Sequence, residues 1–235
     1  MIRGDVRAGE LLELWERAGS LPPVERALCL AAAAGGPVDR LRHSPIGQTH
    51  AYVLGLRDAV LGGRLEATAS CPSCAARAEF EVQVADLHAA PAGPAELTDG
   101  DCIVRVRAPT PADLLDAAAT ADPLAAEQLL RDRCVEVVAG EGTARALERA
   151  EARLAELDPL AEVLVELSCP ECGTAFRSDL DVTAFVWAEL EARAQRILHE
   201  VDVLARCYGW TEPDVLDLTE SRRAAYLRLV VDGVA

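Results

Sequence analysis

The sequence of 235 residues contains no lysine, few aromatic residues and no long apolar run. Its 23 basic residues are therefore all arginines, and 39 acidic residues outnumber them to give a formal net charge of −16. A chain this acidic is poorly suited to binding nucleic-acid phosphates as its main task. No apolar run reaches the roughly 18–20 residues of a membrane span, and no export signal follows Met1. We therefore expect a cytoplasmic protein with no nucleic-acid partner and no membrane span.

Motifs of several enzyme classes are also missing. The Walker A phosphate loop requires a lysine, and the G-x-S-x-G turn of serine hydrolases does not occur. His199-Glu200 resembles the start of a zinc-protease motif, but position 203 is Val203, so the second histidine is absent. Most acidic residues and arginines are interspersed on predicted helices, as on a solvated surface. The sequence therefore predicts a protein that is not an enzyme.

Apolar periodicity predicts an α+β protein that is mainly helical. Hydrophobic residues make up 51% of the chain and aromatic residues only 4%, so the core is expected to consist of leucine, valine and alanine. Residues 1–62 are predicted to form an N-terminal helical region and residues 183–235 a C-terminal helical arm. In that arm an apolar seam recurs every three or four positions, at Leu190, Ala194, Ile197, Val201, Leu204 and Tyr208. Such a seam packs either internally or against another subunit.

Between these helical regions, residues 63–182 contain two segments in which apolar and polar residues alternate, as in β-strands. One segment surrounds Cys71-Pro-Ser-Cys74, and the other surrounds Cys169-Pro-Glu-Cys172-Gly. Each segment is predicted to form a β-hairpin with the cysteine pair in its turn.

The two cysteine pairs are separated by 94 residues (75–168). After a Pro/Gly-rich loop at 89–100 and a short strand, this stretch is predicted to be a helical insert at about 103–158. Its helices are expected to begin at Pro111, Pro123 and Thr143, and the second of them to run through Val138.

The strongest chemical signal is the pair of Cys-Pro-x-Cys turns. Each turn directs two sulfurs at one point, and together Cys71, Cys74, Cys169 and Cys172 supply the four thiolates that Zn²⁺ prefers. We predict one structural Zn²⁺ in a split four-cysteine zinc ribbon. Four cysteines close the coordination shell, which argues against catalysis by the metal.

Two other interpretations of the cysteine pairs remain open. A thioredoxin-like redox pair is expected at a helix start after a βαβ pattern, which the flanking hairpins do not provide. Alternatively, the four cysteines are incidental. The remaining cysteines have no partner at metal-ligand spacing and are expected to serve in packing: Cys29, Cys102, Cys134 and Cys207.

Two features of the C-terminal arm point to partner proteins. Tyr208 and Trp210 lie at a predicted turn between helices, where a tryptophan either covers a small helical core or anchors an interface. Arg222, Arg223 and Arg228 are a local exception to the acidic composition and are predicted to form a second contact surface.

Several short segments of the sequence, in the order in which they occur along the chain, resemble one protein family. They are Ser44-Pro-Ile-Gly47, the run from Arg64 through the first cysteine pair, the second pair, and the tail with His199-Glu200, Tyr208-Gly-Trp210 and Tyr226-Leu. This order resembles the T4-type baseplate proteins of contractile phage tails and phage-tail-like injection systems. The resemblance implies a non-enzymatic component or assembly factor of a baseplate or hub. Its implied partners are other baseplate, hub or tail proteins.

The resemblance leaves several points open. It does not decide whether the protein stays in the finished particle or leaves as an assembly chaperone, and the oligomeric state is unknown. A zinc-ribbon adaptor in transcription or RNA metabolism is an alternative that the acidity disfavours. A Cys-x-x-Cys thiol oxidoreductase is a third possibility.

Overall fold

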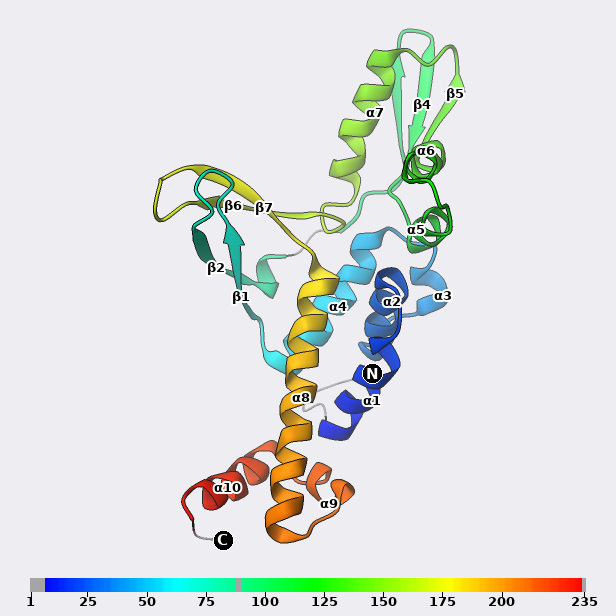
Figure 1. The fold of residues 1–235 in the computed structure, drawn as a ribbon. Helices are drawn as coiled ribbons and strands as arrows, with labels where there is room; N and C mark the ends of the chain where they lie inside the picture. Colours follow the sequence, from blue (N-terminus) through cyan, green and yellow to red (C-terminus); the bar gives the residue numbers. More distant parts are fainter. Residues whose placement is uncertain (1–6, 88–89, 234–235) are drawn as a thin grey trace.

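A helix of 27 residues, α8 (Val182–Tyr208), runs through the lower half of the molecule as drawn in Figure 1. Helices from both ends of the chain pack beside it, and residues 95–157 lie beyond its start. The computed structural model describes residues 7–87 and 90–233. The ends of the two predicted helical regions, 1–6 and 234–235, and the start of the predicted loop at residue 89 lie outside this description. Within it, no helix combines the length and apolar character needed to cross a membrane.

The N-terminal region forms four helices: α1 (Ala8–Gly19), α2 (Pro23–Ala33), α3 (Val38–Leu41) and α4 (Ile46–Leu61). Helices α1, α2 and α4 pack against α8, whereas α3 packs against α2 and α4. Pro23 is favourable at the start of α2 because a backbone N–H in the first turn of a helix has no acceptor within the helix, so its absence costs no hydrogen bond. Leu11, Leu14 and Ala18 share one face of α1 and are buried in the main core. Leu190, Ala194 and Ile197 of α8 enter the same core, so this part of the apolar seam packs internally.

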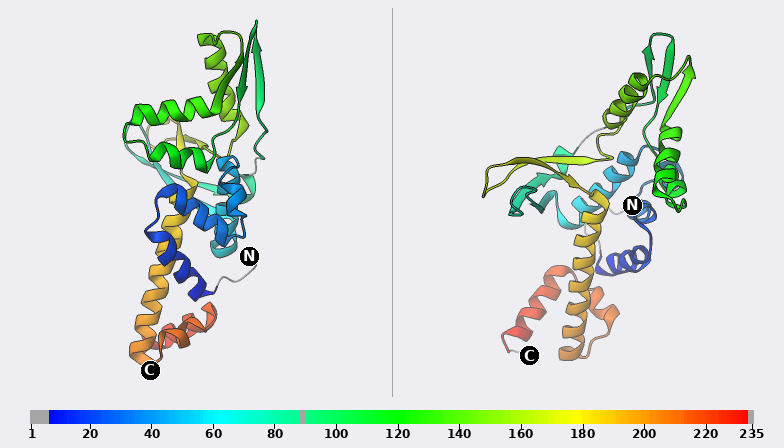
Figure 2. Two further views of the ribbon diagram at one scale, coloured as in Figure 1. Left: turned by 90° about the vertical axis from the view of Figure 1, so that its right-hand side faces the viewer. Right: turned by 45° about the horizontal axis from the view of Figure 1, so that its top comes forward.

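Two antiparallel hairpins extend sideways from this helical body (Figures 1 and 2). The first pairs β1 (Arg64–Ser70) with β2 (Arg77–Gln83), which a short 3-10 turn, η1 (Val84–Asp86), follows. The second pairs β6 (Val163–Ser168) with β7 (Ala175–Leu180). Both hairpins were predicted from period-2 alternation, and β2 lies beside β6. The mixed α+β class with small antiparallel sheets is therefore confirmed.

The segment between the hairpins is not purely helical, so the predicted helical insert is wrong in part. The segment contains a three-stranded antiparallel sheet with the strand order β3 (Ala95–Asp99), β4 (Cys102–Val106), β5 (Val135–Ala139). It also contains three helices: α5 (Pro111–Ala118), α6 (Pro123–Cys134) and α7 (Ala144–Leu157). The helix from Pro123 ends at Cys134 instead of continuing through Val138. The β-branched residues of β5 pair with β4, and a short apolar run does not distinguish helix from strand by periodicity.

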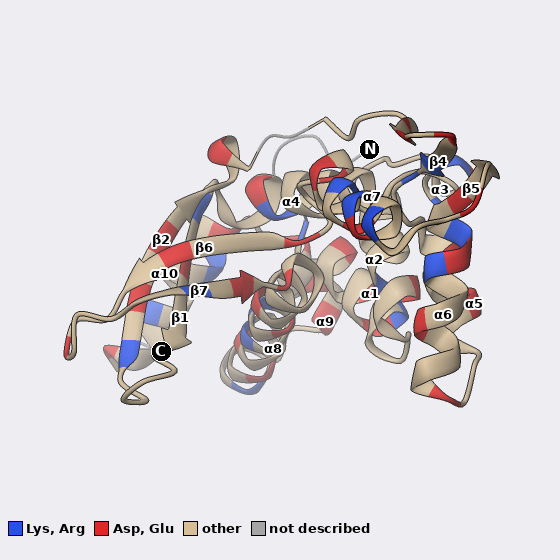
Figure 3. Ribbon diagram, turned by 90° about the horizontal axis from the view of Figure 1, so that it is seen from above, with Lys and Arg blue, Asp and Glu red and all other residues tan. Residues whose placement is uncertain are grey.

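The insert has a small core of its own. Alternate residues of β4, Cys102, Val104 and Val106, are buried with Ala146 and Ala150 of α7. On the other face of the sheet, Arg105 forms ion pairs with Glu96 and Glu136 across the strands. Acidic residues and arginines are interspersed on α7 in the view from above (Figure 3). The insert is thus a second packed unit at one end of the molecule.

Asp113 ties three elements of the insert together. Its carboxylate accepts hydrogen bonds from Arg107 (2.7 and 3.0 Å), from Arg133 (3.3 Å) and from the Thr110 backbone at the start of α5 (2.9 Å). Burial alone would raise the pKa of Asp113, but hydrogen bonds from Arg107 and Thr110 outweigh it and hold the pKa well below its usual range.

We expect Asp113→Asn to lower the free energy of unfolding by about 2 kcal/mol at neutral pH, because charged hydrogen bonds to a buried carboxylate are lost. A depressed folded-state pKa gives stability that is present above the unfolded pKa of about 3.9 and is lost as the pH falls below it. Between pH 7 and pH 3 the free energy of unfolding, measured with denaturant, should therefore fall less in the variant than in the wild type. Asp116→Asn is the control, since that side chain is exposed and forms an ion pair with Arg133. An equal acid response in variant and wild type would contradict this role for Asp113.

The C-terminal arm turns back after α8. Gly209 adopts a left-handed conformation (φ 70°) that ends the helix. Thr211 and Thr219 then cap α9 (Glu212–Leu216) and α10 (Glu220–Val231), which lie beside the far end of α8 (Figure 1). Val215 of α9 and Leu204 of α8 are both fully buried at this end.

Candidate metal centre

The two cysteine pairs occupy the same kind of turn. In the first, the Cys71 N–H donates to the Ala76 carbonyl and the Ala75 N–H donates to the Cys71 carbonyl (both 2.9 Å). In the second, the Cys169 N–H donates to the Thr174 carbonyl (2.9 Å) and the Gly173 N–H to the Cys169 carbonyl (3.0 Å). Each cysteine pair is therefore presented by the same backbone scaffold at a hairpin tip.

The equivalence extends to backbone conformation. The residue directly after the second cysteine of each pair has a left-handed φ: Ala75 at 60° and Gly173 at 71°. Ala75 is the single non-glycine residue with positive φ among those the structure describes. A side chain with a Cβ pays a conformational cost in this region that glycine avoids.

Exchanging the residue types at these two turn positions gives a paired prediction. Ala75→Gly relieves the left-handed strain and is expected to be neutral or to stabilise the protein by up to about 1 kcal/mol. Gly173→Ala introduces that strain and is expected to destabilise by about 1 kcal/mol. Added Cβ atoms at Gly173 meet nothing within 4 Å, so the effect is conformational and not a clash. Thermal unfolding of both variants measures the two changes in stability. If both substitutions destabilise the protein, or both stabilise it, the left-handed φ does not account for the effects.

The four sulfurs meet where the two hairpin tips come together. Cys71 Sγ lies 3.7 Å from Cys172 Sγ, and Cys74 Sγ lies 3.5 Å from Cys169 Sγ. All four sulfur atoms are within 4.8 Å of one another. A tetrahedron with metal–sulfur bonds of about 2.3 Å has sulfur–sulfur edges of about 3.8 Å. The donor set and its spacing therefore fit one metal ion held by two cysteines from each hairpin.

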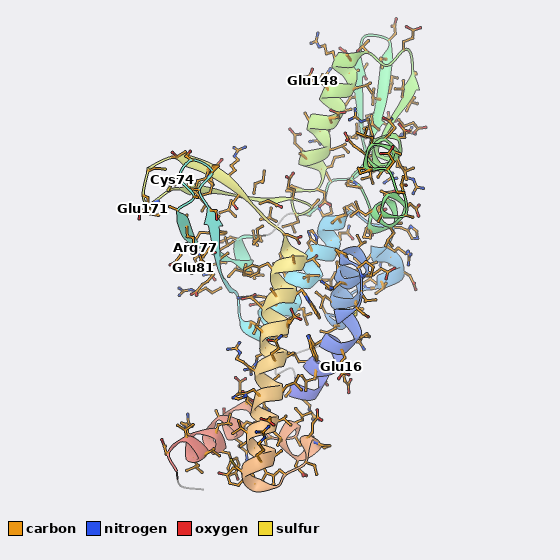
Figure 4. The ribbon with its side chains drawn as sticks, in the orientation of Figure 1. Glu16, Cys74, Arg77, Glu81, Glu148 and Glu171 are labelled. Atoms are coloured by element: carbon orange, nitrogen blue, oxygen red, sulfur yellow. The ribbon has the colours of Figure 1, made fainter. Side chains whose placement is uncertain are left out.

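The site is half open to solvent. Cys71 and Cys169 are buried, whereas Cys74 and Cys172 are exposed at the tips. Cys74 and Glu171 lie close to each other at the outer end of the hairpins, away from α8 (Figure 4). If a metal ion with tetrahedral coordination were bound here, the four sulfurs would occupy all of its coordination positions.

The thiols of the cluster differ in acidity. Hydrogen bonds from the Thr174 hydroxyl and backbone lower the pKa of Cys172 to about 6. The backbone N–H of Ala76 would lower the pKa of Cys74, but the neighbouring sulfurs raise it to about 12. Four adjacent sulfurs therefore do not all carry a negative charge by themselves, because each thiolate opposes the ionisation of the next. A divalent cation would remove this repulsion.

The remaining cysteines lie outside the cluster. Cys102 and Cys134 are buried in the insert, and burial raises the pKa of the Cys134 thiol. Cys29 is half-buried, as expected for packing. Cys207 near the end of α8 is exposed, so packing does not account for this residue.

The structure gathers the predicted partner-binding aromatics into one cluster. Tyr208 and Trp210 stack with ring centroids 4.8 Å apart, and Tyr226 of α10 meets both rings edge-on. All three residues are partly exposed. Tyr226 was not among the predicted partner-binding residues, because it lies 16 positions from Trp210 and joins it only where α10 folds back along α8.

The three predicted arginines do not form one surface. Arg223 is only 3% exposed, and it donates to Glu200 of α8 (2.9 Å) and to the Leu218 carbonyl (2.6 Å). Its role is to hold α10 against α8, so the expectation of a three-arginine surface is corrected at this residue. Arg222 and Arg228 are exposed, and neither forms an ion pair within residues 7–87 and 90–233.

Comparison with protein-family models, with curated proteins and with solved structures finds no match for this chain.

Proposed function

We propose that Cys71, Cys74, Cys169 and Cys172 bind one structural Zn²⁺ and that the two hairpins form a split zinc ribbon. The convergence of four sulfurs from two tips carries this proposal. An all-sulfur tetrahedral set favours zinc among the common cellular cations. Zinc would join the segment before the insert to the segment after it, and so close a loop of 94 residues (75–168).

We further propose that the chain is a non-enzymatic component or assembly factor of the baseplate or hub of a phage-tail-like contractile injection system. The residues that carry the resemblance in the sequence support this role. It is consistent with a closed metal shell that leaves no open coordination position, and with an elongated molecule that presents separate surfaces at its two ends (Figure 1). The proposal places the function in protein–protein contacts.

Metal analysis of the purified protein tests the first proposal. We expect one equivalent of zinc per chain in the wild type and none in a Cys71→Ser/Cys169→Ser variant. Cys207→Ser, which removes an exposed cysteine outside the cluster, should retain the full equivalent. A wild-type protein that contains no metal after purification under reducing conditions, and takes up none from added Zn²⁺, would overturn it.

A genetic experiment tests the second proposal. If sheath, tube and wedge genes lie beside the gene for this chain, its deletion should abolish complete contractile particles seen by electron microscopy, and the wild-type gene should restore them. Insulin reduction by the purified protein would instead indicate a thiol oxidoreductase. Salt-dependent binding to nucleic acid would indicate a nucleic-acid adaptor.

A further inference from the structure

An apolar groove of about 790 Å³ lies between α6 and α7 of the insert and the segment that leads into β6. Leu114, Leu130 and Leu154 line it from the insert, and Leu160 and Leu164 line it from the opposite side. Leu164 is 49% exposed, which is unusual for a large apolar side chain beside other leucines. We name this feature the α6–α7 groove.

The charges around the α6–α7 groove are almost all negative. Five acidic residues line it: Asp86, Glu127, Glu151, Asp158 and Glu162. The one basic residue there, Arg131, is already bridged by Glu127 (3.1 Å) and Glu151 (2.8 Å). Asp86 and Glu162 are exposed, and no ion pair engages them within the part of the chain that the structure describes. The groove therefore suits an apolar segment that carries positive charge at its margins.

Helix α10 presents such a segment at the other end of the molecule. Its outer face consists of Arg222, Ala225, Arg228 and Leu229, all exposed, and we name it the α10 face. Leu229 is 42% exposed, and the two arginines have no carboxylate partner among the described residues. Arg223, on the opposite side of the helix, is anchored to α8, so the α10 face points away from the molecule.

The insert, which lines one side of the groove, and α10 lie at opposite ends of the molecule, as Figures 1 and 2 show. One chain cannot bring its own α10 to its own groove without dismantling this arm. We propose that the α10 face of one copy docks in the α6–α7 groove of a second copy. The occupant is thus a second chain, chosen because its basic and apolar side chains complement the acidic, apolar groove.

This contact has a structural consequence. It joins two different surfaces, so it is heterologous, and each copy retains one free α10 face or one free groove. Repetition of such a contact generates a closed ring or an open filament. The overall charge of −16 opposes association at long range. At physiological ionic strength the screening length is about 8 Å. Repulsion between the net charges of two copies is therefore screened, and the complementary charges at the contact determine whether the copies associate.

Two variants with one surface blocked in each provide the test. Arg228→Glu/Leu229→Glu alters the α10 face, and Glu162→Arg/Leu164→Arg alters the groove. Every changed residue is exposed, so both variants are expected to fold. The matched control is Arg196→Glu/Leu198→Glu, which makes the same type of change at two exposed positions of α8 outside both surfaces. Circular dichroism and thermal unfolding establish that the variants are folded.

Sedimentation velocity of the full chain gives the readout. We expect the wild type and the control to associate as concentration rises, and each blocked variant to associate at least about tenfold more weakly. An equimolar mixture of the two blocked variants should form a 1:1 dimer and nothing larger, because one intact groove meets one intact α10 face.

Three results would overturn the proposal: a wild type that stays monomeric at all concentrations, a dimer that both blocked variants still form, or a mixture of these variants that stays monomeric. The purified chain alone is measured, so the outcome is independent of the proposed baseplate role. The baseplate proposal can fail while the chain still self-associates, and the self-association proposal can fail while the chain is still needed for particle assembly.

Discussion

Replacing Cys71 and Cys169 by serine is expected to lower the free energy of unfolding by about 5 kcal/mol or more. Structural zinc sites contribute roughly 10–16 kcal/mol in isolated zinc-finger peptides, and these hairpins also have contacts with the helical body. For a chain of this size, 5 kcal/mol corresponds to a fall in Tm of about 10–20 °C. Differential scanning calorimetry of the wild type and the variant measures this change.

The loss should be concentrated in the hairpins. A two-stranded hairpin is marginally stable alone, and residues such as Leu164, Glu166 and Ser168 along β6 are exposed. The metal is the only proposed link between the two tips. Hydrogen exchange should therefore become fast in β1, β2, β6 and β7 of the variant, while α1, α4 and the buried half of α8 stay protected.

Two controls separate the metal from the cysteines themselves. Cys207→Ser should unfold like the wild type, because Cys207 is exposed and lies outside the cluster. A strong chelator should lower the Tm of the wild type and leave the Cys71→Ser/Cys169→Ser variant unchanged. If the variant has the wild-type Tm although the wild type contains zinc, the metal does not hold the hairpins together.

Local features of the fold were predictable from the sequence because their signals are local. The hairpins follow from period-2 alternation around Cys71-Pro-Ser-Cys74 and Cys169-Pro-Glu-Cys172. The convergence of the four sulfurs also followed, because a tetrahedral metal requires all of them at one point. In the insert, by contrast, β5 is a strand only because β4 provides its partner, and Val135 alone does not reveal this.

Contacts between distant residues were beyond the reach of the sequence. Arg223 appeared to belong to a basic surface, but its buried position depends on Glu200, 23 positions earlier on another helix. The same holds for Gly47 and Asp158, which are 111 positions apart. Asp158 belongs to no motif, and the Ser44-Pro-Ile-Gly47 segment does not reveal that Gly47 contacts Asp158. The packing that makes them important exists only in the folded chain.

Gly47 and Asp158 form the junction between the insert and the helical body. The first turn of α4 has no side-chain cap of its own. Instead, the Gly47 N–H donates to Asp158 Oδ2 (2.7 Å), and the Ile46 N–H donates to the Pro109 carbonyl (3.2 Å). Burial raises the pKa of Asp158, whereas the Gly47 hydrogen bond opposes the shift. A carboxylate from the insert therefore caps a helix of the body.

Gly47→Ala is expected to destabilise the protein by about 3–5 kcal/mol. A Cβ at this position would lie 2.0 Å from Asp158 Oδ1 and 2.8 Å from Leu160 Cβ, so the junction must separate. The estimate combines overpacking of about 1–3 kcal/mol with the loss of a charged hydrogen bond of about 1.5–3 kcal/mol. Chemical denaturation measures the change. Hydrogen exchange should show its largest increase at the start of α4 and in residues 158–161.

Gly55→Ala on the same helix is the matched control. An added Cβ there meets nothing within 4 Å, and a glycine in a helix interior costs about 0.5–1 kcal/mol relative to alanine. This substitution should therefore stabilise the protein by that amount. Combining Gly47→Ala with Asp158→Ala removes the clashing carboxylate but leaves Leu160. The double variant should therefore lose less stability than the sum of the losses in the two single variants. If Gly47→Ala and Gly55→Ala have the same effect, Asp158 does not occupy the start of α4, and the insert is held to the body in some other way.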